Sequence, residues 1–174
     1  MINARRAATG EDPCDPDGVE TTFVTLSTVD AEEVLALQTE VHTRQLKGQT
    51  RMPLLTQTTN DIAADLADKR MLCLGVRDER GHLLAAVRAY VGSATAQVGR
   101  LCVLPTLQNI GLAQDLVGEL EQRMPEHVRE VHIFTEEDAT HAREFYARLG
   151  YEESRVEAME AGFHIIELSK KLAA

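Results

Sequence analysis

The sequence predicts a single α/β domain in which flanking helices cover a mixed, mostly antiparallel central sheet of about seven strands. Two observations support this class. Short apolar and β-branched runs separated by turn residues follow one another over residues 71–104, as expected of antiparallel hairpins. After residue 105, helical and strand patterns alternate, which favours a sheet of mixed direction packed against helices.

The first half is expected to supply four strands and two helices. Asp30, with Glu33 three residues later, is expected to cap a helix that buries Val34 and the apolar residues one and two turns further on. Either Thr59 or Asn60 is expected to cap a second helix. The expected strands are 21–27, 71–77, 82–91 and 95–104.

The second half is expected to contain two helices, the first of them long, and three strands. Leu112 opens a helix to Met124, with apolar residues at four-residue spacing. A second helix ends at Gly150, which suits the position after a helix because positive φ costs glycine little. The expected strands are 128–135, 151–157 and 162–170.

Length and composition fit one soluble domain. The 174 residues contain no apolar run of membrane-span length, so no membrane partner is expected. Residues 1–18 lack the apolar core of a secretory signal and are expected to form a flexible arm ahead of the domain at 19–174. Three scattered cysteines favour a reducing cytoplasm over a disulfide framework, and no zinc-ligand spacing predicts a metal site.

The formal net charge is −10. This balance argues against nucleic acid as a partner, because phosphate binding needs a basic surface. An acidic surface could attract a cationic amine, although the same charge also serves solubility.

The segment from Gln108 to Ala113 links a strand to a helix through a glycine. Backbone N–H groups in such a loop, together with the first turn of the helix, form a site for a phosphate group. Strand–glycine–helix turns also occur for purely structural reasons, and this loop has neither a GxGxxG pattern nor a P-loop lysine.

A second segment, about thirty residues further along the chain, makes the loop a more specific signal. It contains Phe145-Tyr146, then Arg148, then Gly150-Tyr151. The loop and this segment, in this order, resemble the GNAT superfamily of N-acetyltransferases over roughly residues 72–172. The family's loop reads Gln/Arg-x-x-Gly-x-Gly/Ala, which Gln108, Gly111 and Ala113 match.

The resemblance implies the GNAT fold, with a fourth and a fifth strand that run parallel and splay apart, and transfer of acetyl from acetyl-CoA to an amine. It implies Tyr146 as the general acid. The cofactor residues that it implies are Leu101, Cys102, Val103, Gln108, Asn109, Ile110, Gly111, Leu112, Ala113 and Tyr146. Within this set, a backbone N–H near Val103 would contact the thioester carbonyl.

The chain departs from the family pattern at the general base. Many members have a glutamate where this chain has Gln97, and an asparagine where it has Ala139. A water relay, an amine that arrives neutral, or a carboxylate from elsewhere would then serve. The candidate carboxylates are Glu32, Glu33 and Glu136.

The acceptor is not identified by the sequence. Arg88 and Tyr90 lie on an expected strand of the acceptor region, but alternation does not say which of them faces it. Arg44 and Arg51 lie where the family builds its acceptor site, and would favour a carboxylate if they faced it.

Three functions are compatible with these features. The first is acetyl transfer to an amine of a small molecule or a protein. The second is a non-catalytic acyl-CoA-binding or regulatory protein, which Gln97 keeps open. The third is an acyltransferase toxin acting on aminoacyl-tRNA, which the acidic charge disfavours. The acyl chain and the oligomeric state stay open, with a homodimer as one alternative.

Overall fold

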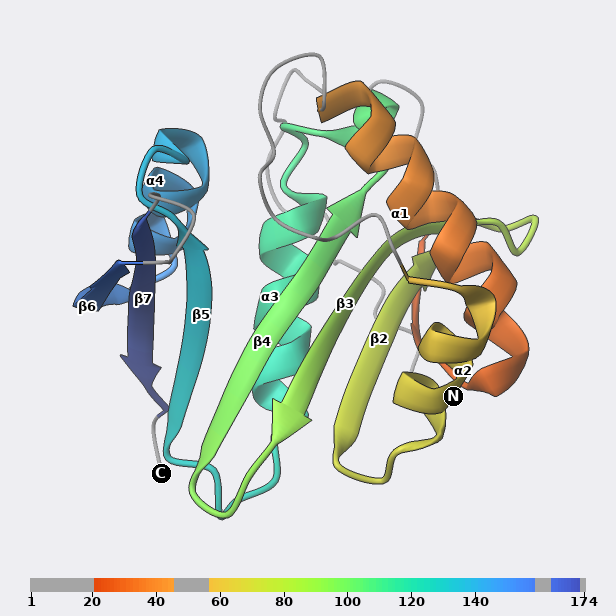
Figure 1. Cartoon of the computed structure of the whole chain (residues 1–174). Coiled ribbons are helices and arrows are strands. Elements are labelled where there is room, and N and C mark those ends of the chain that lie inside the picture. The colour runs from red at the N-terminus through yellow and green to blue at the C-terminus, as the bar shows by residue number, and fades with distance from the viewer. Residues whose placement is uncertain (1–20, 46–56, 159–163, 173–174) are drawn as a thin grey trace, which may run out of the picture.

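The protein is described by a computed structural model covering residues 21–45, 57–158 and 164–172. The expected arm, residues 1–18, lies outside the described residues. The seven-stranded sheet has the order β1-β2-β3-β4-β5-β7-β6, and of its neighbouring pairs only β4 and β5 run parallel (Figure 1). The strands are β1 (Thr22–Thr25), β2 (Met71–Arg77), β3 (Leu83–Val91), β4 (Thr95–Val103), β5 (Glu130–Glu136), β6 (Glu152–Ala158) and β7 (His164–Lys171). The predicted fold class is confirmed.

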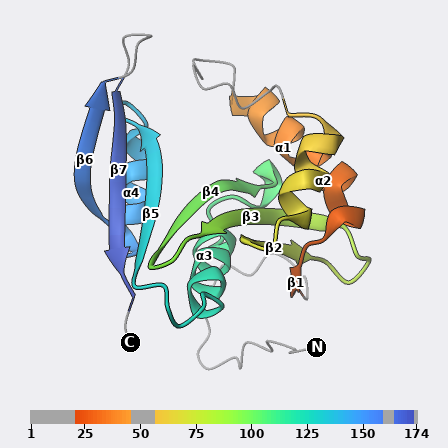
Figure 2. The ribbon, with the colours of Figure 1, turned by 60° about the horizontal axis from the view of Figure 1, so that its bottom comes forward.

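Helices cover both faces of the sheet (Figure 2). On one face, α1 (Ala31–Gln45) and α2 (Thr59–Ala67) pack on an apolar cluster that includes Ile62 and Cys102. On the other face, α3 (Leu112–Gln122) and α4 (Thr140–Arg148) contribute Leu116 and Tyr146 to a larger cluster. None of the described helices is long and apolar enough to cross a bilayer.

The caps of the first two helices differ from expectation. Asp30 ends a short 3₁₀ turn (Thr28–Asp30), where its carboxylate accepts the Ser27 N–H at 2.7 Å. The capping box that the structure describes here joins Ser27 and Asp30, and Glu33 pairs instead with Arg77 at 2.6 Å. The α2 cap is Thr58, one residue before the expected positions, with Asp61 as its reciprocal partner. A side chain with two good partners takes the one that tertiary packing offers, and spacing alone does not reveal it.

The parallel pair splays apart along its length. The four pairs between β4 and β5 run from Thr95 with Glu130 to Val98 with Ile133, although both strands continue beyond them. Past this point β4 and β5 diverge, leaving between their ends a gap that is called the splay below (Figure 1). The structure therefore has the splay that the family resemblance implied.

Candidate active site

The backbone of Val103 faces the splay. The Leu104 N–H donates to the Leu84 carbonyl at 3.0 Å. Hydrogen-bonded and non-bonded pairs alternate along an antiparallel ladder. Val103, opposite Ala85, therefore directs its N–H and C=O away from β3 and toward the side that β5 has left. A backbone donor that neither β3 nor β5 uses as a ladder partner is thus held on a strand, at the side of β4 from which β5 has diverged.

The chain after β4 brings the predicted phosphate loop back to the same strand end. The side-chain amide of Gln108 donates to the Val103 carbonyl at 3.3 Å. Asn109 and Gly111 adopt left-handed φ angles of 67° and 88°, and Gly111 is the N-cap of α3. No side chain in the described part of the chain caps α3, so the N–H groups of its first turn are left for another acceptor.

The predicted cofactor residues divide into three groups. Gln108, Asn109, Ile110 and Gly111 are exposed in the loop. Leu112 is buried in the core at the start of α3, and Ala113 is half-buried beside it. In β4, Cys102 and Val103 are buried and Leu101 packs against the core. By the alternation described above, the Cys102 backbone faces Ala86 of β3, whereas the Val103 backbone faces the splay.

Tyr146 is fixed on α4 by the way that this helix ends. Gly150 has a φ of 87°, and the N–H groups of Gly150 and Tyr151 donate to the carbonyls of Ala147 and Tyr146, which is a Schellman motif. The Tyr146 side chain is buried, and burial, with a smaller contribution from the nearby Cys102, raises its pKa to about 12. No hydrogen bond joins its hydroxyl to another residue that the structure describes. The phenol therefore stays protonated at neutral pH, with its proton unused.

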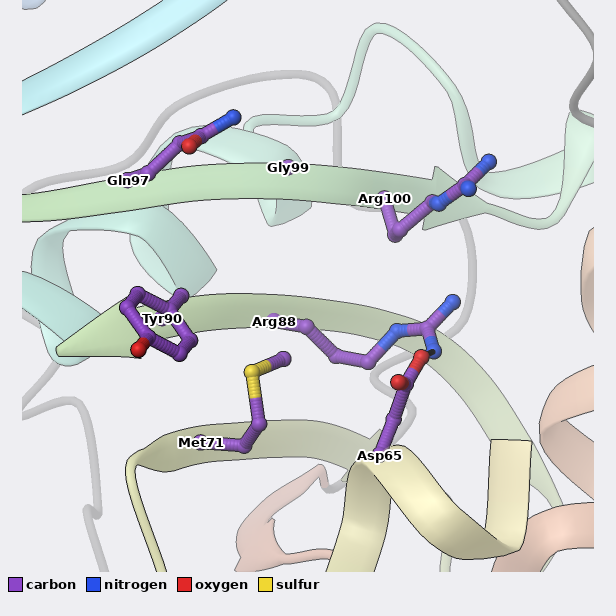
Figure 3. A pocket seen from close by; sticks show the side chains of 7 residues that line it. All are labelled: Asp65, Met71, Arg88, Tyr90, Gln97, Gly99 and Arg100. Atoms are coloured by element: carbon purple, nitrogen blue, oxygen red, sulfur yellow. Dashed lines mark hydrogen bonds and ion pairs between the residues drawn. The ribbon is translucent and has the colours of Figure 1, made fainter. Parts of the chain in front are cut away.

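A pocket opens on the α1/α2 face of the sheet, beside β3 and β4, with a cavity volume of about 220 Å³ (Figure 3). We call it the β3–β4 pocket. Tyr90 and Arg88, whose direction the sequence left open, both line it. Its lining residues are Asp65, Met71, Arg88, Tyr90, Gln97, Gly99 and Arg100.

Arg100 reaches this pocket through a bulge in β4. Gly99 lies opposite Arg88 and Cys102 opposite Ala86, so Arg100 and Leu101 together face the single residue between them on β3. Arg100 has a left-handed φ of 56°. The bulge turns both Gly99 and Arg100 toward the pocket. Strict alternation assigns Arg100 to the opposite face, which is why the sequence did not reveal it.

Arg88 is the buried structural centre of the pocket. It is 3% exposed and pairs with Asp65 of α2 at 2.6 Å. It also donates to Gln38 of α1 and, at 3.2 Å, to Gln57 just before α2. Burial lowers its pKa, with opposing effects from Asp65, which raises it, and Arg100, which lowers it. Arg88 thus connects both helices to the sheet, and both of its terminal nitrogens already donate to Asp65, Gln38 or Gln57.

Comparison with known proteins agrees with this geometry. The family model described as an acetyltransferase (GNAT) domain matches residues 36–172. The chain belongs to the GNAT acetyltransferase family. An uncharacterized Bacillus subtilis protein, YyaT, is 31% identical over 86 residues, which are 49% of this chain and 57% of that protein. The match thus spans little more than half of that relative's length.

Two solved GNAT structures show the same fold at low identity. The ribosomal-protein-S18-alanine N-acetyltransferase of Escherichia coli has a TM-score of 0.72 at 18% identity, covering 88% of this chain and 95% of its own. The PaiA N-acetyltransferase of Thermoplasma acidophilum, solved in complex with coenzyme A, has a TM-score of 0.72 at 16% identity, covering 87% and 99%.

Gln97, which stands where many GNAT proteins have a glutamate, lines the pocket and lies next to an ionisable pair on β5 and β7. In the parallel register Gln97 is opposite His132 of β5, so both side chains share one face of the sheet. His132 Nδ1 lies 2.6 Å from Glu167 Oε1, and Nε2 lies 3.8 Å from Glu130 Oε2. Sequence reasoning missed this pair, since Glu167 is 35 residues further along the chain.

The other predicted base candidates are placed differently. Glu33 is held by Arg77, and Glu32 lies in the first turn of α1. Glu136, at the end of β5, has one buried carboxylate oxygen without a hydrogen-bond partner among the described residues. The Arg44 side chain and Arg51, expected near the acceptor, lie outside what the structure describes.

Proposed function

We propose that this GNAT protein transfers the acetyl group of acetyl-CoA directly to an amine of a small molecule or a protein, within a ternary complex. The observation that carries the proposal is the orientation of Val103, whose N–H faces the splay between β4 and β5. The uncapped start of α3 follows the same strand, and the β3–β4 pocket lies beside it.

The residues at the splay fit coenzyme A by their chemistry. The uncapped N-terminus of α3 and the left-handed turn at Asn109 and Gly111 present backbone N–H groups suited to phosphate oxygens. Gln108 would hold the loop against β4 through the Val103 carbonyl. Acetyl-CoA would supply the activated acyl group as a thioester.

Three protein groups would share the chemistry. The Val103 N–H would donate a hydrogen bond to the reacting carbonyl oxygen from a fixed strand position. The Tyr146 phenol, kept protonated by burial, would be the proton donor on the leaving-group side. His132 would act as the base. Its Nδ1 lies 2.6 Å from Glu167 Oε1 and would donate to that carboxylate, so Nε2, which is 3.8 Å from Glu130 Oε2, would be the atom that takes up the proton of the amine.

Calorimetric titration with acetyl-CoA, with free CoA alongside, tests the cofactor assignment. We expect binding of both in the micromolar range, about −8 kcal/mol. If neither acetyl-CoA nor CoA binds, the loop from Gln108 to Ala113 is an ordinary turn and the proposal is overturned.

A second candidate is a non-catalytic acyl-CoA-binding protein. It is favoured by one observation, which is that Gln97 lines the pocket where many GNAT enzymes have a carboxylate. Release of free thiol from acetyl-CoA in the presence of an amine panel separates the two candidates. Cofactor binding without thiol release in any amine would favour the second. The cytoplasmic location and a homodimer stay predictions.

A further inference from the structure

The β3–β4 pocket holds one guanidinium group whose charge is not balanced. Arg88 shares its charge with Asp65, the carboxylate among the lining residues. The Nη1 atom of Arg100 is buried and has no hydrogen-bond partner among the residues that the structure describes. The lining therefore carries an excess positive charge at Arg100.

Two unfavourable features coincide at this residue. A buried cationic nitrogen without an acceptor loses hydration that nothing in the described protein replaces. The left-handed φ of 56° at a residue with a long side chain adds backbone strain. Such costs persist where the surrounding fold imposes them, and residues of this kind gather at ligand-binding sites. The partners that bind a guanidinium most strongly are oxyanions, such as carboxylates and phosphates.

The size and shape of the pocket limit what can supply that oxyanion. Arg100 and Gln97 lie at opposite ends of the β4 side, with Gly99 between them, and Tyr90 and Met71 lie nearer the Gln97 end (Figure 3). A Cβ atom added at Gly99 would meet nothing within 4 Å. The cavity of about 220 Å³ is below the usual range for drug-sized ligands. A pocket of this size suits a small molecule, and Arg100 offers a positive group at one end of it.

We propose that the acetyl acceptor is a small amine that also carries a carboxylate, as an amino acid does, and that Arg100 binds this carboxylate. The inference rests on the acetyl transfer proposed above. The planar guanidinium offers two parallel N–H donors that match the two carboxylate oxygens. The positive charge of Arg100 repels an ammonium group, so the carboxylate end of the acceptor, and not its amine, is the end expected at this residue.

Matched pairs of acceptors test the proposal. Thiol release is measured with each L-amino acid, with the amine that its decarboxylation gives, and with the corresponding aminoalkylphosphonate. The wild-type protein is expected to prefer at least one amino acid over its amine by tenfold or more in kcat/KM. Equal use of the amino acid and the amine in every pair overturns the proposal. A preference for the phosphonate over the amino acid would show that the site binds another oxyanion and overturn the choice of a carboxylate.

Substitution of Arg100 tests whether this residue causes the preference for an amino acid over the matched amine. Arg100→Gln is expected to raise KM for the amino acid at least tenfold while leaving KM for the matched amine and the affinity for acetyl-CoA unchanged. Arg100→Lys should recover part of the loss. Arg80→Gln removes the same charge from the exposed turn between β2 and β3 and should behave as wild type. An unchanged amino-acid preference in Arg100→Gln overturns the role of Arg100.

A binding measurement covers the case in which no acceptor is turned over. Calorimetry of N-acetyl-amino acids added to the CoA-bound protein should show binding that Arg100→Gln weakens at least tenfold. No binding to the wild-type protein would overturn the carboxylate site even if CoA binds. Loss of CoA binding itself would instead count against the proposed function.

Discussion

The rings of Tyr146 and Tyr151 meet edge to face, with centroids 5.7 Å apart, yet their hydroxyls have different surroundings. The Tyr151 hydroxyl donates to Glu121 of α3 at 2.7 Å, and Lys170 of β7 contacts the same carboxylate at 2.6 Å. Tyr151 thereby links α3 to the strands beyond the splay. The Tyr146 hydroxyl has no such partner in the described part of the chain, which leaves its proton available.

Removing the Tyr146 hydroxyl should therefore affect turnover, whereas removing the Tyr151 hydroxyl should affect stability. Tyr146→Phe is expected to slow turnover at least tenfold, because the proton donor is lost, while acetyl-CoA affinity stays the same. Tyr151→Phe is expected to lower the free energy of unfolding by about 1.5–3 kcal/mol, because a hydrogen bond to a carboxylate is lost, with turnover largely retained. Steady-state kinetics and denaturant unfolding measure the two effects. Full turnover in Tyr146→Phe would remove this residue from the chemistry.

Gly111 allows a test of the phosphate loop that does not depend on turnover. A Cβ atom there would meet nothing within 4 Å, so a substitution acts through the φ of 88° and through its charge. Gly111→Asp is expected to weaken acetyl-CoA binding at least tenfold, about 1.4 kcal/mol. Gly118→Asp adds the same charge further along α3, also into open space, and should bind normally. Equal affinities in calorimetry would refute the loop assignment.

The fold was predictable from sequence because its strands and helices are marked by local patterns. Gly150 is an example, since a glycine after an apolar helix face predicts the left-handed residue that ends α4. The loop from Gln108 to Ala113 was equally local. The pocket was not, because Arg100 faces it only through a bulge, and Asp65 and Arg88 meet across 23 residues of chain. Neither relation leaves a periodic signal.

His132 provides the test of the proposed base. His132→Gln keeps a side chain able to donate to Glu167 but cannot take up a proton, so kcat/KM is expected to fall about 100-fold. Acetyl-CoA affinity should not change. His82→Gln, in the exposed turn between β2 and β3, serves as the matched control. Wild-type kcat/KM in His132→Gln would place the base elsewhere, with Glu136 as the next candidate.

The pair formed by Asp65 and Arg88 should contribute to stability more than an exposed pair does. Asp65→Ala leaves the 3% exposed Arg88 guanidinium without its carboxylate, and is expected to lower the free energy of unfolding by about 1–3 kcal/mol. Glu157→Ala breaks the exposed pair with Arg155 and should cost at most about 1 kcal/mol. Urea unfolding compares them. Equal losses would show that Gln38 and Gln57 are sufficient partners for Arg88.

The two buried thiols should make the protein sensitive to alkaline pH. Burial raises the pKa values of Cys73 and Cys102 from 9.0 to about 11. The folded state thus retains protons that the unfolded chain releases, so stability is complete below pH 9 and falls as pH rises to about 11. In a Cys14→Ser variant, neither thiol should react with an aromatic disulfide reagent at pH 8 until denaturant is added, because the thiolate is the reactive form. Rapid labelling of the native protein at pH 8, or an unfolding free energy that stays flat between pH 9 and 11, would contradict this account.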